Sequence, residues 1–173
     1  MNTHLCKKSV AESIFLKEGL GKPEKYQELM PQLKALIDGE EDVIANVANI
    51  IAALKEVFSF LWIGIYFVKE TKGKPQLVLG PFQGPPACVR IEKGRGVCGS
   101  AWERKETVIV PDVNLFPGHI ACSILSRSEI VVPVLQNGYV IAVIDVDSTE
   151  LAAFDETDQK YLSEIAQLIS GLL

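Results

Sequence analysis

The chain has 173 residues and a mass of 19.0 kDa; 48% of its residues are hydrophobic and 23% are charged. This composition is typical of a folded globular protein and excludes a disordered or fibrous chain. The 22 acidic side chains outnumber the 17 basic ones, and the net charge of -5 argues against binding to the nucleic-acid backbone. The longest apolar stretch, residues 57–68, is too short to cross a membrane as a helix. We therefore expect neither nucleic acid nor a membrane as a partner.

The spacing of apolar residues predicts two helices near the N-terminus, at residues 23–38 and 41–58, with a kink at Pro31 in the first. A short helix is expected near Val97, and a closing helix is expected to begin near Asp155. Runs of β-branched and aromatic residues predict five strands, at residues 61–68, 76–80, 107–110, 129–135 and 139–147.

This order of elements predicts an α+β fold, in which N- and C-terminal helices flank a central, mainly antiparallel β-sheet. No repeat or linker divides the chain, so we expect a single domain over residues 21–173, preceded by an N-terminal extension at residues 1–20. The first residues lack an apolar core followed by a cleavage site, so a cytoplasmic protein with reduced thiols is expected.

Three of the four cysteines, Cys88, Cys98 and Cys122, are expected to lie on or beside loops, while Cys6 stands apart near the N-terminus. A redox role is one interpretation of this grouping. Unpaired cysteines are also common as small buried hydrophobic residues. A zinc site made by the three cysteines and His119 is a third interpretation, which no CxxC pair supports.

Acidic residues follow the last predicted strands. Side chains alternate along a strand, so Asp145 and Asp147 share one face, about 7 Å apart. The connection before this strand decides where Glu129 lies. A two-residue turn at 137–138 places Glu129 on the other face, and a three-residue loop at 136–138 places it opposite Asp145.

We predict the three-residue loop, which gathers Glu129, Asp145 and Asp147 on one face. Mutual repulsion and partial burial should raise the pKa of at least one of these carboxyl groups toward neutrality. That group would then be able to donate a proton. In the alternative interpretation, the three acids are ordinary strand-end charges that pair with Arg127 or with lysine.

The strand at residues 61–68 carries Trp62, Gly64 and Tyr66 on one face. A glycine between two aromatic residues leaves a gap, so this face is interpreted as a pocket with Trp62 and Tyr66 as substrate contacts. Filling of the protein core by aromatic side chains is the alternative.

Six segments together carry a family resemblance: WIGIYF, LGPFQGPPACVRI, GRGVCGSAW, VPDVNLFPGHIAC, SRSEIVVPV and IAVIDVDS. They resemble the free methionine-(R)-sulfoxide reductases, a stand-alone branch of the GAF-domain fold, over nearly the whole chain. The resemblance implies a GAF-like sheet. It also implies Cys122 as the nucleophile, Cys88 as the recycling thiol and Cys98 as a further thiol in the site.

By the same resemblance, Glu129, Asp145 and Asp147 match the acidic substrate-binding positions, and Trp62 matches an aromatic substrate contact. The implied reaction reduces free methionine sulfoxide. Cys122 attacks the sulfoxide sulfur and becomes a sulfenic acid, which forms a disulfide with Cys88 or Cys98. Thioredoxin then reduces the disulfide, and neither a metal nor a bound cofactor is expected.

The resemblance further suggests a homodimer and a role in oxidative stress. A GAF sensory module that binds a small ligand without catalysis is the competing hypothesis. It predicts attached signalling machinery, and the 173 residues contain none.

Overall fold

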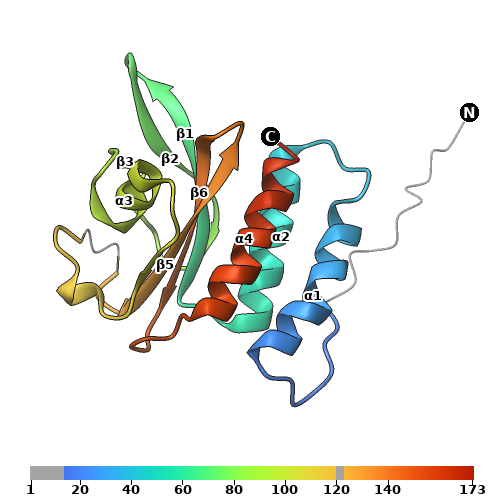
Figure 1. Cartoon of the computed structure of the whole chain (residues 1–173). Coiled ribbons are helices and arrows are strands. Elements are labelled where there is room, and N and C mark those ends of the chain that lie inside the picture. The colour runs from blue at the N-terminus through green and yellow to red at the C-terminus, as the bar shows by residue number, and fades with distance from the viewer. Residues whose placement is uncertain (1–13, 120–122) are drawn as a thin grey trace, which may run out of the picture.

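The computed structural model of the chain describes residues 14–119 and 123–173. Its centre is a six-stranded antiparallel sheet in the order β3-β2-β1-β6-β5-β4 (Figure 1). The strands are β1 (Trp62–Thr71), β2 (Lys74–Gln83), β3 (Arg90–Ile91), β4 (Val108–Val110), β5 (Ser128–Gln136) and β6 (Tyr139–Ser148). The two-residue strand β3, which pairs with Leu77 and Val78 of β2, is absent from the sequence-based prediction.

Two helices cover one face of the sheet, α2 (Val43–Phe58) and α4 (Glu156–Ser170), and α1 (Lys22–Ile37) packs on the outer side of this pair (Figure 1). The shorter α3 (Gly96–Arg104) lies on the opposite face, and a 3-10 turn, η1 (Val113–Leu115), follows β4. The predicted α+β architecture is confirmed. Helix α1 continues past Pro31, the position of the expected kink. No helix within the described ranges combines the length and the apolar character needed to span a bilayer.

The sheet separates two apolar clusters, as the alternation of side chains along β1 predicts. Ile63, Ile65 and Phe67 face the side of α2 and α4 and belong to the larger cluster, which also includes residues of α1. Trp62 and Tyr66 face the side of α3 and belong to the smaller one. The larger cluster contributes most of the buried apolar surface and therefore most of the stabilisation. Polar groups on the α3 side of the sheet cost the fold less.

The hairpin between β5 and β6 corrects one prediction. Its turn has two residues, Asn137 and Gly138, both with positive φ, and Gln136 pairs with Tyr139. The predicted three-residue loop is therefore wrong. The register then shifts between Val134 and Leu135, because Leu135 pairs with Val140 whereas Val134 pairs with Ala142. This bulge leaves one extra residue, Ile141, on β6.

The bulge has the effect that the longer loop was expected to have. Beyond the bulge, Glu129 pairs with Asp147. The longer loop would have paired it with Asp145, two residues away on the same strand. A shift of two residues keeps the same face, so Glu129, Asp145 and Asp147 lie together as predicted.

A buried ion pair connects the first turns of α1 and α4. The Lys22 ammonium contacts the Asp158 carboxylate and lies 3.0 Å from Asp155 Oδ2. Tyr26 donates its hydroxyl hydrogen to Asp158 Oδ1 at 3.0 Å, and Asp158 is only 1% exposed. Burial, reinforced by the Asp158 charge, raises the pKa of Tyr26 far above its usual value, so the phenol stays a donor. Asp158 thus joins the two helices.

We expect Asp158→Asn to lower the free energy of unfolding by about 2 kcal/mol, because it removes the buried charge that pairs with Lys22. Asp155→Asn is the matched control. Its side chain is 57% exposed, and asparagine also caps helices well, so the loss should stay below about 0.5 kcal/mol. Urea unfolding at pH 7 measures both. Equal effects would show that Asp158 has no special part in holding α1.

Candidate active site

An aromatic wall lies on the α3 side of β1. The Trp62 ring stacks on Phe82 and Tyr66, with centroid distances of 5.5 and 6.0 Å, and it is 4% exposed. Its indole nitrogen donates to the carbonyl of Pro85 at 3.0 Å. Across the sheet, Trp62 pairs with Asp147 of β6. The strand pairing therefore places the aromatic wall beside the acidic residues.

Gly64 contributes to this wall in a way that differs from the sequence-based interpretation. A Cβ atom at Gly64 would lie 2.3 Å from Trp62 Cη2 and 2.6 Å from Phe82 Cβ. The indole itself thus occupies the space beside the glycine. Gly64 is needed to admit the Trp62 ring and does not leave an open gap for a ligand.

Three carboxyl groups gather on β5 and β6 beside this wall. Glu129 and Asp145 are 6% and 7% exposed, and Asp147 is partly buried. His119 Nε2 lies 3.4 Å from Glu129 Oε2, and the Ser126 hydroxyl donates to Asp147 Oδ1. None of the ion pairs among the described residues brings a lysine or arginine to these acids.

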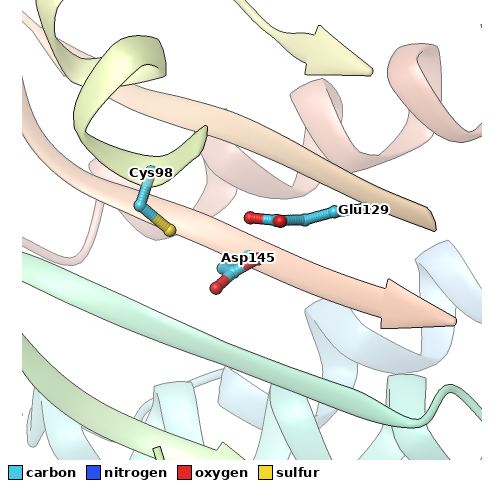
Figure 2. Close-up of side chains that lie close together, drawn as sticks. All are labelled: Cys98, Glu129 and Asp145. Atoms are coloured by element: carbon cyan, nitrogen blue, oxygen red, sulfur yellow. The ribbon is translucent and has the colours of Figure 1, made fainter. Parts of the chain in front are cut away.

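Cys98 reaches the acids from the opposite layer. It lies in the first turn of α3, is 3% exposed, and has its sulfur within 4.8 Å of carboxylate oxygens of Glu129 and Asp145 (Figure 2). The backbone passes close beside this turn, because a Cβ at Gly99 would lie 2.4 Å from the Glu92 carbonyl oxygen. Gly99 therefore lets the loop pack against α3 where that helix presents Cys98 to the sheet.

Burial, with no lysine or arginine paired to these acids among the described residues, shifts the pKa values of the cluster. Burial and the neighbouring carboxylates raise the pKa values of Glu129 and Asp145 well above the usual range. Burial, followed by the charges of Asp145 and Glu129, also raises the pKa of the Cys98 thiol. At Asp147, burial raises the pKa, although the Ser126 hydrogen bond and His119 oppose it. Burial therefore favours the protonated forms of these acids and of the thiol.

One polar atom of the cluster lacks a partner. Asp145 Oδ1 is fully buried and accepts no hydrogen bond from any described residue. Such an atom is costly unless a donor or a cation supplies the missing interaction. Asp145 is one of the residues that line a small pocket of about 20 Å³, together with Trp62, Tyr66, Ala87, His119, Glu129 and Asp147.

Five of the eight predicted site residues line this pocket: Trp62, Tyr66, Glu129, Asp145 and Asp147. Cys98 borders the acids, and Cys88 is half-buried and packs against the apolar cluster on the same side of the sheet. Cys122 lies outside the described residues, as does Cys6.

The suggested zinc set of three cysteines and His119 includes Cys122, so it is not tested. Among the described residues, Cys98 instead converges with Glu129 and Asp145. The contacts of His119 with Glu129 and of Ser126 with Asp147 are absent from the sequence-based prediction. The only signal for His119 and Ser126 in the sequence is that these residues belong to the segments VPDVNLFPGHIAC and SRSEIVVPV.

Comparison with known proteins places the chain in a family. Residues 38–173 match the GAF domain. The chain is 42% identical to the free methionine-R-sulfoxide reductase of Escherichia coli, over 89% of this chain and 92% of that protein. The chain belongs to the free methionine-R-sulfoxide reductase family of GAF-domain proteins.

Two further relatives agree with this assignment. GAF domain-containing protein A of Dictyostelium discoideum is 55% identical over 94% of this chain and 100% of its own length. The free methionine-R-sulfoxide reductase from Neisseria meningitidis, solved in complex with its substrate, superposes with a TM-score of 0.88 at 48% identity. That match covers 93% of this chain and 95% of the solved one.

We expect Asp145→Asn to stabilise this reductase-family protein at pH 7 to 8. An unfolded aspartate loses its proton near pH 4, whereas the folded Asp145 retains it to higher pH. The unfolded state then binds fewer protons, so the free energy of unfolding falls as the pH rises above about 4. Asparagine has no such proton to lose.

The melting temperature of Asp145→Asn should exceed that of the wild type at pH 8, by about 3 °C for each kcal/mol, and the two should converge near pH 4. Asp38→Asn, at an exposed aspartate, is the control and should show no pH-dependent difference. A variant less stable than the wild type at every pH would contradict the burial cost assigned to Asp145.

Proposed function

We propose that this protein reduces free methionine-R-sulfoxide to methionine. The observation that carries the proposal is the cluster of buried carboxyl groups with raised pKa values that faces the Trp62 wall. Membership of a reductase family, and likeness to a reductase solved in complex with its substrate, support it.

The pocket offers complementary groups for a free amino acid that carries a sulfoxide. The carboxylates accept the α-ammonium, and the unpartnered Asp145 Oδ1 supplies an acceptor for it. The Trp62 ring covers the apolar part of the side chain. The cavity has room for about one water molecule, so its walls must move apart when the amino acid enters.

Glu129 or Asp147 serves as the acid. Breaking the S–O bond requires a proton on the leaving oxygen, and burial raises the pKa of both carboxyl groups, which favours the proton-carrying form. His119 and Ser126 orient these two groups through their contacts with Glu129 and Asp147.

We assign the nucleophile to Cys122. The described residues near it in the chain, His119 and Ser126, both contact the acids. Cys122 stands between these two residues in the sequence. Cys98 is a poor nucleophile, because burial and the adjacent acids keep its sulfur protonated.

The reaction balances with thiols alone. The Cys122 thiolate attacks the sulfoxide sulfur, the oxygen passes to Cys122 as a sulfenic acid, and methionine leaves. Cys88 then attacks the sulfenic acid, which forms a disulfide and releases water. A dithiol protein of the thioredoxin type reduces this disulfide by exchange. We assign the attack on the sulfenic acid to Cys88, because burial raises the pKa of the Cys98 thiol and makes Cys98 the weaker nucleophile.

Cys122→Ser should abolish turnover, because it removes the attacking sulfur, whereas Cys6→Ser should leave it unchanged. Cys98→Ser should retain a substantial fraction. Oxidation of NADPH by thioredoxin and its reductase, after addition of free methionine-R-sulfoxide, measures all three. Residual activity in Cys122→Ser would overturn the assignment. Binding of the sulfoxide by the wild type without turnover would favour a ligand-sensing module.

Recognition of the free ammonium predicts discrimination against blocked substrates. N-acetyl-methionine-R-sulfoxide has a neutral amide in place of the ammonium and would leave buried carboxylates unpaired. We expect kcat/KM to fall by about 1000-fold or more relative to the free amino acid. Similar kcat/KM values for the two compounds would rule out the proposed ammonium contact.

A further inference from the structure

We propose that Cys98, Glu129 and Asp145 form a binding site for one Zn²⁺ ion. These side chains come from three elements, α3, β5 and β6, and converge on one point (Figure 2). Each is at least nine-tenths buried. The site uses a thiol that the proposed reduction does not need as nucleophile.

The geometry is close to that of a zinc site. One donor atom from each residue lies within 4.8 Å of the other two. Tetrahedral zinc, with bonds of about 2.0 to 2.3 Å, holds its ligands roughly 3.3 to 3.8 Å apart. Closing the gap therefore requires donor movements of roughly 1 Å, which side-chain rotations can supply.

An independent observation supports a cation ligand at this cluster. Asp145 Oδ1 is buried without a hydrogen-bond donor, and neither Glu129 nor Asp145 forms an ion pair with lysine or arginine among the described residues. The Asp145 carboxyl group already contacts Cys98 and Glu129, and a metal bound through its Oδ1 would satisfy the unpartnered oxygen and compensate the buried acids at once.

The donor set favours zinc over the hard cations. Mg²⁺ and Ca²⁺ prefer six or more oxygen ligands, whereas a thiolate with two carboxylates suits Zn²⁺. The ion would replace the protons of the cluster, so binding should strengthen as the pH rises. His119 Nε2, 3.4 Å from Glu129 Oε2, can orient that ligand from outside, which leaves the fourth position open.

Zinc at this point would occupy the subsite proposed for the substrate ammonium. It should therefore compete with methionine sulfoxide. This consequence rests on the proposed function, whereas metal binding itself does not.

The direct test titrates the fully reduced protein with Co²⁺, a spectroscopic substitute for Zn²⁺. A thiolate-to-cobalt charge-transfer band should appear, saturate at one equivalent and disappear on addition of Zn²⁺. The band should be lost in Cys98→Ser and retained in Cys88→Ser and Cys122→Ser. No band, or a band that survives Cys98→Ser or needs Cys122, would overturn the site.

A second variant keeps the test independent of any folding defect in Cys98→Ser. Glu129→Gln retains the thiol and should weaken Co²⁺ binding at least tenfold. Its melting temperature verifies that it is folded. Unchanged affinity in a folded Glu129→Gln would also contradict the assignment.

Activity assays separate this proposal from the proposed function. Zn²⁺ should raise KM for methionine-R-sulfoxide without lowering kcat, and EDTA should reverse the effect. Inhibition that lowers only kcat would overturn competition at this subsite. A metal-free protein that shows no reductase activity would refute the proposed function and leave the Co²⁺ result unaffected.

Discussion

The candidate site depends on one constraint: carboxyl groups are buried on β5 and β6, and no lysine or arginine of the described residues neutralises them. Their protons follow from it, because an ionised Glu129 or Asp145 would lose its hydration and repel its neighbours. The protonated state of Cys98 has the same origin. The raised pKa values of the acids and of the thiol, and the missing partner of Asp145 Oδ1, therefore all follow from the burial of these groups.

The fold tolerates these buried carboxyl groups because the two faces of the sheet contribute differently to stability. Ile130, Val132 and Val134 of β5 face the helices and join a large apolar cluster, whereas Glu129 faces the α3 side. Burial on the helical face is the main stabilising contribution, and it leaves the other face able to carry destabilising groups. The ion pair between Lys22 and Asp158 holds α1 to this helical layer, far in sequence from the site.

Periodicity predicted much of this from the sequence, because alternation along a strand is a strict geometric rule. It placed Trp62 with Tyr66, and Asp145 with Asp147. Register is less accessible, since it depends on turn type and bulges: the loop was wrong, yet the bulge at Ile141 returned Glu129 to the expected face. The strand β3 has two residues, too few for a periodic signal. Contacts of His119 and Ser126 need tertiary structure.

A buried acid that keeps its proton can exchange that proton for another positive group. In the two proposals, the α-ammonium of an amino acid or a divalent metal ion supplies the partner that Asp145 Oδ1 lacks, and each would displace or share the protons of Glu129 and Asp145. The same burial that makes one carboxyl group a proton donor thus makes its neighbours acceptors for cations. Cys98 distinguishes the two cases, because its sulfur adds a strong ligand for a soft metal and only a weak hydrogen-bonding group for an ammonium.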